Sequence, residues 1–224
     1  MRKIILVSLA ALVAAIVLLA VGPSPQFKPD WSEESPDGDL VAQQFSNGVG
    51  EHEIWLYRKE MPDERVLLYK HHRYVKLCFS PDERWICITD HVGSTDSYTK
   101  LFRRGQGICF SEVTEARVGE KAWSFFAKEN GLKEPPAYMH AYTCAAEWAA
   151  NSRALLICLS GHGDTENHLE SWYCVFDLDT LSPSLDLKLM NRGAFVSNGN
   201  LHPDGILNKT HSPSSRRQAQ RSGK

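Results

Sequence analysis

Apolar residues in this chain come in short runs separated by polar turns, and the order of runs recurs. The stretch 80–102 shows the unit clearly: the turn Ser80-Pro81-Asp82 precedes the apolar run 85–88, then a polar loop and a second strand-like run ending at Phe102. Pro presets its own φ and Asp bonds the local backbone, so this tripeptide favours a turn. Runs of this length between turns predict β-strands.

The same criteria divide the chain into three units and a fragment. Strands are predicted at 39–46, 54–57 and 65–69 in the first unit, at 74–79, 84–90, 97–103 and 107–111 in the second, and at 138–148, 155–159, 172–176 and 185–189 in the third. A fourth start follows at His202-Pro203-Asp204-Gly205. The third turn carries Asn151 where the first two carry an aspartate, and Asn serves the same turn chemistry.

The spacing of the turns indicates the size of a unit. Asp37 and Asp82 lie 45 residues apart, a period typical of four-stranded propeller blades. The gap from Asp82 to Asn151 is longer, and residues 112–131 account for most of the excess. Apolar residues fall there at helical spacing before the stop signal Asn130-Gly131, so the sequence predicts one short inserted helix at about 112–131.

The loops also predict how the strands pair. Strands joined by four to seven residues must pair antiparallel, because a parallel pair needs a crossover of about a dozen residues. Several runs are apolar at consecutive positions, which indicates strands covered on both faces. A β-sandwich is the structural alternative, and it would alternate more clearly. We therefore expect an all-β fold of about three antiparallel, propeller-like blades, incomplete or open.

The turns Ser35-Pro36-Asp37-Gly38 and Ser80-Pro81-Asp82, with a weaker copy at 202–205, resemble those of the TolB-like and WD-repeat-like β-propeller families. Glu83 replaces the expected Gly, and the third unit lacks Pro. The resemblance implies a binding or scaffolding platform and no catalytic residues. Three units fall short of the usual minimum of about four blades. The chain is then an open stack, a ring closed by a homo-oligomer, or a shortened relative.

Residues 4–21 contain no charge and follow Arg2 and Lys3. This pattern predicts an N-terminal hydrophobic helix, and we favour a membrane anchor over residues 1–22, with a cleaved secretory signal as the alternative. The Pro-rich linker 23–34, the repeat domain 35–205 and a disordered basic tail, 206–224, would lie outside the cytoplasm. The protein is thus expected to be membrane-anchored and extracytoplasmic, or secreted or periplasmic if the segment is cleaved.

Charge and cysteine content narrow the function. Between residues 22 and 204 the chain has 18 basic and 27 acidic residues, and this acidic balance argues against a nucleic-acid partner. The six cysteines include no C-x-x-C pair, so a zinc or redox motif is not predicted. An oxidising compartment would allow one or more disulfides, whose connectivity the spacing leaves open.

One loop recurs with chemically useful residues. The segments 47–53, 91–97 and 161–168 each combine Gly, an acid and a His, and equivalent loops of a radial repeat emerge on one side. The candidate binding residues on this rim are His52, His91, Asp96, His162, Asp164, Glu166 and His168. Imidazole with carboxylate suits zinc, but no motif such as H-E-x-x-H supports a metal, so no cofactor is predicted. The alternative interpretation is hydrophilic hairpin tips. His71-His72 is expected to be an exposed turn.

We therefore interpret the chain as a binding or protein-interaction module with a protein partner. The alternative is a metal-dependent or hydrolytic enzyme that uses the same rim. Ser160-Gly161-His162 places a serine near a histidine, but the G-x-S-x-G pattern is absent. No catalytic residue is predicted.

Overall fold

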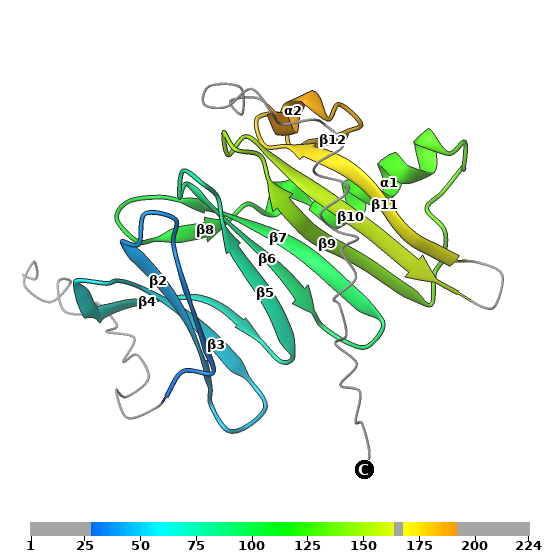
Figure 1. The fold of residues 1–224 in the computed structure, drawn as a ribbon. Helices are drawn as coiled ribbons and strands as arrows, with labels where there is room; N and C mark the ends of the chain where they lie inside the picture. The colour runs from blue at the N-terminus through cyan, green and yellow to red at the C-terminus, as the bar shows by residue number, and fades with distance from the viewer. Residues whose placement is uncertain (1–27, 164–167, 192–224) are drawn as a thin grey trace, which may run out of the picture.

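The computed structural model describes residues 28–163 and 168–191, and its strands form three four-stranded units in chain order (Figure 1). Unit 1 contains β1 (Trp31–Glu34), β2 (Leu40–Ser46), β3 (His52–Arg58) and β4 (Met61–His71). Unit 2 contains β5 (Tyr74–Phe79), β6 (Trp85–His91), β7 (Asp96–Arg104) and β8 (Phe110–Glu112). Unit 3 contains β9 (His140–Trp148), β10 (Ala154–His162), β11 (His168–Asp177) and β12 (Ser182–Ser184). Within each unit, neighbouring strands pair antiparallel, as the short loops predict.

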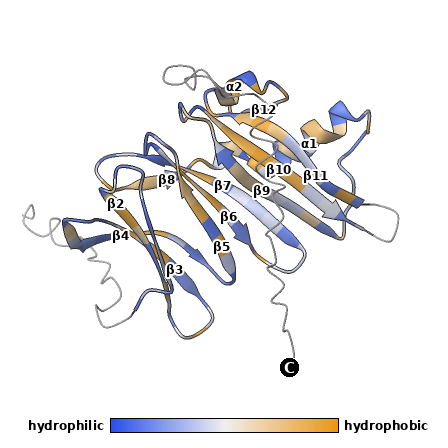
Figure 2. Ribbon diagram, viewed as in Figure 1, coloured by the Kyte–Doolittle hydropathy of each residue, from blue (hydrophilic) through white to orange (hydrophobic). Residues whose placement is uncertain are grey.

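Two apolar clusters hold the units together. The cluster between units 1 and 2 includes Ile54 and Leu56 of β3 with Ile86 and Ile88 of β6. The second cluster contains Cys87, which lies between Ile86 and Ile88 in β6, together with apolar residues of unit 3. Strand β6 is therefore apolar at consecutive positions because each of its faces is buried against a different unit. Figure 2 shows the hydrophobic residues concentrated on the strands.

A short helix is inserted between units 2 and 3, where the sequence predicts it. A single 3₁₀ turn, η2 (Thr114–Ala116), leads into α1 (Val118–Glu129). Val118, Ala122 and Phe126 are four residues apart, so they share one helix face, which is buried in the cluster with unit 3. Asn130 ends the helix, and Gly131 follows it with a φ of +69°. The helix thereby packs against strands of units 2 and 3.

One strand pairing departs from the expectation that the units form separate antiparallel sheets. After the helix, β9 returns beside β7 and pairs with it in parallel, through Asp96 opposite Ala141 and Ser97 opposite Tyr142. Units 2 and 3 are therefore continuous along one sheet, while unit 1 forms a sheet of its own. The prediction missed this pairing because the helical insertion supplies the crossover that a parallel pair needs.

The first and last strands also differ from the sequence-based expectation. Trp31–Glu34, assigned to the linker, forms β1 and pairs with β2. The closing strand was expected at 185–189, but it lies at Ser182–Ser184, and the short helix α2 (Lys188–Asn191) follows. Apolar residues of α2 cover the outer face of unit 3, with Leu189 and Met190 in a third small cluster. The apolar residues near 185–189 that suggested a strand therefore include helical residues that pack against the sheet.

The predicted N-terminal helix, the basic tail and the turn at 202–205 lie outside the described residues. Across 28–163 and 168–191, no helix is both long and apolar enough to cross a bilayer. All six cysteines fall within these ranges, and each is a free thiol.

The three S-P-D-type turns have the same backbone geometry. In each turn the fourth residue donates its N–H to the first residue's carbonyl at 2.9 Å, from Gly38, Glu83 and Ser152. The same three residues have positive φ, at 79°, 58° and 60°. In the third turn, the side chain of Asn151 accepts the N–H of Arg153. Asp37 and Asp82 accept the N–H two residues further on in the same way at their own turns. The substitution of Asn for Asp therefore preserves the turn, as predicted.

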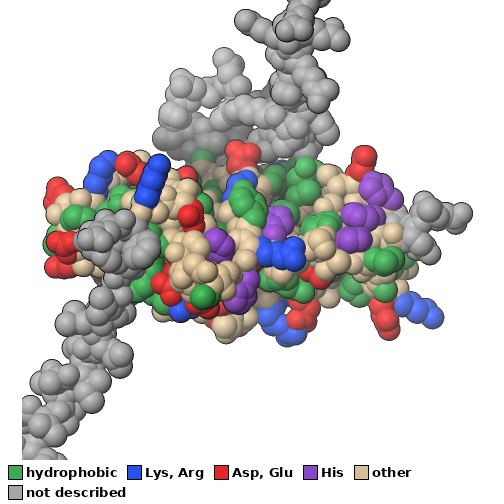
Figure 3. Space-filling view, turned by 90° about the horizontal axis from the view of Figure 1, so that it is seen from below, with side chains coloured by type: hydrophobic (Ala, Val, Ile, Leu, Met, Phe, Trp, Pro, Cys, Tyr) green, Lys and Arg blue, Asp and Glu red, His purple; other side chains and the backbone are tan. Residues whose placement is uncertain are grey.

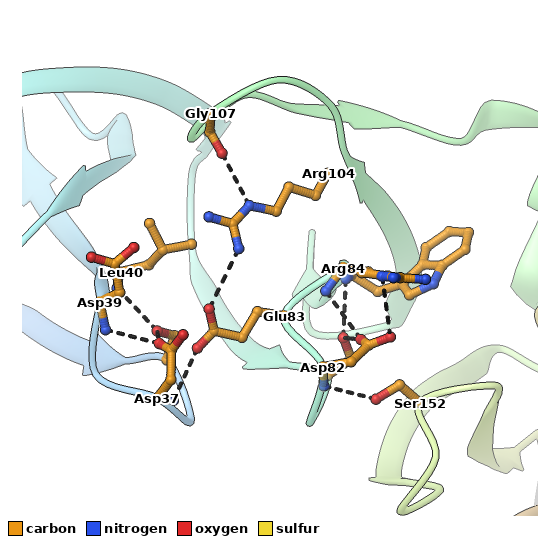
Figure 4. Close-up of polar contacts among 12 residues, drawn as sticks. Asp37, Asp39, Leu40, Asp82, Glu83, Arg84, Arg104, Gly107 and Ser152 are labelled. Carbon is orange, nitrogen blue, oxygen red and sulfur yellow. Dashed lines mark hydrogen bonds and ion pairs between the residues drawn. The ribbon is translucent and has the colours of Figure 1, made fainter.

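The departures from Gly at the fourth position have a structural reason. Glu83 accepts the backbone N–H of Asp37 from unit 1 at 3.0 Å, and Ser152 accepts that of Asp82 from unit 2 at 2.9 Å (Figure 4). Glu83 also forms an ion pair with Arg104 at 3.4 Å. Each of these side chains thus joins its turn to the preceding unit, which offsets the strain of a left-handed backbone. We call this end of the strands the turn edge.

Candidate functional site

The edge opposite the turns collects histidine. All seven histidines of the described residues lie at strand ends or directly beside one: His52, His71, His72, His91, His140, His162 and His168. The antiparallel pairs and the parallel β7–β9 pair bring these strand ends to one side. We call this side the histidine edge. Figure 3 looks toward it and shows histidine side chains from the middle of the view to its right side.

The structure places five of the seven predicted rim residues at this edge. His52 begins β3, His91 ends β6, Asp96 begins β7, and His162 and His168 flank the β10–β11 loop. Asp164 and Glu166 lie outside the described residues. The five residues share an edge but lie in separate groups, each formed with strand neighbours. Their role in binding stays a prediction.

The first group pairs two histidines of unit 1. His52 lies directly opposite His71 in the β3–β4 ladder, and their rings stack with centroids 5.2 Å apart. The Nδ1 of His52 lies 3.4 Å from an Oδ of Asp30. The expectation that His71 is exposed was wrong: it is 3% exposed, because it lies under the ring of His52 and beside Tyr69. His71 is the last residue of β4, and its cross-strand partner buries it.

A buried polar cluster connects units 1 and 2 directly beneath this pair. Tyr69 donates its hydroxyl to Asp90 at 2.6 Å. Burial lowers the pKa of His71, which favours the neutral ring, and its Nδ1 lies 2.9 Å from the carbonyl of Arg73. That contact assigns the proton to Nδ1, so Nε2 is an acceptor. Burial, and then the bond to Asp90, raises the pKa of Tyr69.

Two acceptors in this cluster lack partners within the described residues: Nε2 of His71 and Oδ1 of Asp90. Both residues are more than nine-tenths buried. Buried polar atoms are normally hydrogen-bonded, and an orphaned acceptor raises the free energy of the fold. His71 belongs to unit 1 and Asp90 to unit 2, so the two acceptors come from both units.

The remaining groups belong to units 2 and 3. The ring of His91 lies 5.4 Å from that of Tyr74. The rings of His140 and His162 stack at 4.4 Å, and His168 lies 6.3 Å from His162. His140 and Tyr142 both contact the carbonyl of Ser94 in the β6–β7 loop, at 3.2 and 2.7 Å. These contacts tie the loop of unit 2 to the first strand of unit 3, so the edge is continuous.

The rings of the histidine edge contact one another, neighbouring aromatic rings and backbone carbonyls. Within the described ranges, no three His, Cys, Asp or Glu side chains are placed to hold a metal ion. No serine hydroxyl of those ranges hydrogen-bonds a histidine ring. What the edge offers is a row of aromatic rings whose nitrogens can donate or accept hydrogen bonds.

Three residues of the edge were missed by sequence reasoning: His71, Asp90 and His140. His71 and His140 lie directly opposite the predicted His52 and His162. Their signal was the strand register, which the positions of the turns would have fixed. Asp90 gave no signal, because an acid at the end of an apolar strand is ordinarily solvated.

No protein-family model and no curated protein matches this chain. Among solved structures, the chain has a distant similarity to β-propeller domains. The β-propeller domain of the Trilobed protease from Pyrococcus furiosus shares 13% identity over 66% of this chain, with a TM-score of 0.40. TolB from Acinetobacter baumannii shares 14% over 69%, with a TM-score of 0.38. The chain spans 39% and 31%, respectively, of those chains.

Proposed function

We propose that the chain is an extracytoplasmic, membrane-anchored binding module that presents the histidine edge to a protein partner. The observation that carries the proposal is the placement of all seven described histidines at one edge, built from corresponding strand ends of three units. The hydrophobic stretch at 4–21 supports the anchor and the extracytoplasmic side.

The edge suits recognition by surface complementarity. His162 and His168 are exposed, while His52, His91 and His140 are half-buried and held by strand pairing. A partner would therefore meet rings of fixed position, which reduces the entropy lost on binding. Two strongly exposed apolar side chains, Val49 and Val92, at 85% and 48%, project from the loops of this edge. Apolar tips among polar rings match the mixed character of a protein–protein interface.

The proposal is tested by recovering the partner from membranes. The full chain, tagged at its C-terminus, would be solubilised and the co-purifying proteins identified. A triple variant, His91→Ala, His162→Ala and His168→Ala, should lose the partner, because the rings at the edges of two units are removed. A control variant, Lys59→Ala at the turn edge, should retain it. Equal recovery with both variants would contradict the proposal.

The enzyme alternative rests on the same rim. The described residues supply no metal-holding group and no serine–histidine pair on which to build it. Metal content measured on the purified chain, with and without His91→Ala and His162→Ala, separates the two functions. A stoichiometric metal that these variants remove would favour the enzyme.

A further inference from the structure

A hollow of about 930 Å³ lies at the turn edge, between units 2 and 3. Unit 2 contributes Asp82, Arg84, Trp85, Arg103, Arg104 and Gly105, and unit 3 contributes Asn151, Ser152, Arg153, Leu178 and Asp179. Its volume lies within the range of small-molecule sites, roughly 300–1,000 Å³. The hollow is separate from the histidine edge, so its function is independent of the proposed one.

Arginine is concentrated in this hollow. Four of the eight arginines in the described ranges line it, against two aspartates, in a chain whose middle is acidic. Guanidinium groups are planar and donate pairs of parallel hydrogen bonds, a geometry that matches phosphate and carboxylate. The hollow therefore holds half of the arginines of the described ranges, drawn from two units.

Two of the four arginines are engaged in holding the walls. Arg104 is half-buried, pairs with Glu83 and donates its Nε to the carbonyl of Gly107 at 3.0 Å (Figure 4). Arg153 pairs with Asp179 through two of its nitrogens. These contacts use the carboxylates of Glu83 and Asp179, so both arginines serve as fixed structural groups.

The other two arginines are less engaged: Arg84 has one long ion pair, and Arg103 has none within the described residues. The Nε of Arg84 lies 3.9 Å from Oδ2 of Asp82, whose other oxygen accepts bonds within its own turn. The guanidinium of Arg103 lies 5.6 Å from the centre of the Trp85 ring, and no carboxylate of the described residues is within ion-pair distance of it. The indole face positions the Arg103 guanidinium without neutralising it.

We propose that this hollow binds a small, soluble phosphate monoester, with its phosphate held by Arg103 and Arg84. The guanidinium of Arg103 has no ion pair within the described residues, and that of Arg84 has only the 3.9 Å contact with Asp82. Together they complement a dianion. The hollow is larger than a phosphate group, which leaves room for an organic moiety. The side-chain amide of Asn151, which also lines the hollow, supplies a hydrogen-bonding group for its hydroxyls.

The test titrates the full chain with glycerol 3-phosphate and with inorganic phosphate at constant ionic strength, set with chloride. Binding is followed by calorimetry and by the indole N–H signal of Trp85, which Trp85→Phe identifies. Glycerol 3-phosphate should shift that signal. Arg103→Gln should weaken its binding at least tenfold, and Arg103→Lys should weaken it less, because charge remains without the paired donors.

The control is Arg73→Gln, which removes the same charge at the opposite edge and should leave binding unchanged. Equal weakening by Arg73→Gln and Arg103→Gln would show a general charge effect and overturn the proposal. Absence of any shift at the Trp85 signal would also overturn it. If Arg103→Gln fails to fold, Arg103→Lys together with the Trp85 signal still decides the outcome.

Discussion

The turn edge and the histidine edge lie at the two ends of the same strands, and they satisfy their polar groups differently. At the turn edge one hydrogen bond recurs: the third residue of a turn donates its N–H to the fourth residue of the next turn. At the histidine edge the residue type recurs, but each ring has different contacts, and two buried acceptors lack partners in the described residues.

We expect this difference to separate contacts that stabilise the fold from residues that serve the proposed recognition. A contact repeated with the same geometry in successive units is expected to hold those units together. A residue type repeated with different contacts is expected to serve something outside the fold. Substitutions at the first edge should therefore change the free energy of unfolding, while most of those at the second should change binding and leave the fold intact.

The largest effect is expected for Glu83→Ala. It removes the acceptor for Asp37 and leaves the half-buried Arg104 without its ion pair. Losing one partner of a largely buried pair costs about 2–4 kcal/mol of unfolding free energy. Urea unfolding would measure it. The matched change Glu51→Ala at the histidine edge, where the partner Lys70 is exposed, should cost less than about 1 kcal/mol. Similar losses for the two variants would erase the distinction between the edges.

Gly161→Ala is the exception expected at the histidine edge. A Cβ there would lie 2.6 Å from Cδ2 and 2.8 Å from Cγ of the Tyr138 ring, and 3.1 Å from the carbonyl of His140. Overpacking of this kind costs about 1–3 kcal/mol. Gly93→Ala, whose nearest neighbour would be 3.5 Å away, is the control and should be nearly neutral. Thermal unfolding of both variants would compare them, and equal melting temperatures would contradict this close approach.

Ser152→Ala should have a smaller effect at the turn edge. It leaves the N–H of Asp82 without an acceptor, which costs about 1 kcal/mol. Ser152→Gly removes the same acceptor but relieves the backbone at a φ of 60°. The glycine variant should therefore be more stable than the alanine variant in the same urea experiment. The reverse order would show that the left-handed backbone carries no strain here.

The smallest effect is a dependence of stability on pH. Burial lowers the pKa of His71 in the folded protein, so the unfolded chain binds a proton first as the pH falls. The contribution of His71 is complete above its unfolded pKa, about 6.5, and is lost as the pH falls below it. His71→Gln should flatten the curve of unfolding free energy between about pH 7.5 and 5. An unchanged curve would show that His71 is not buried.

Much of the fold followed from the turns. Ser80-Pro81-Asp82 and its copies located the strands, and the long gap before Asn151 located the helix. The β7–β9 pairing was missed because it depends on where that helix returns the chain, which no local pattern records. The positions of His52, His91 and His162 on one side followed from the repeat, whereas the burial of His71 depends on its cross-strand neighbour.

The arginine-lined hollow was also invisible in the sequence, because Arg103 and Arg153 belong to different units and neither lies in a motif. Glu83 is visible in the sequence only as a residue that replaces the Gly expected at the fourth position of the turn. In the structure it marks a contact between units.

The backbone hydrogen bonds between β7 and β9 have a consequence for how the chain opens. Units 2 and 3 form a single sheet, whereas unit 1 meets unit 2 through side chains and through the connection at 72–73. Amide protons of β2 and β3 are therefore expected to exchange with solvent through partial openings that leave the larger sheet folded. The molecule would then behave as two cooperative blocks, and the smaller would detach first under mild denaturation.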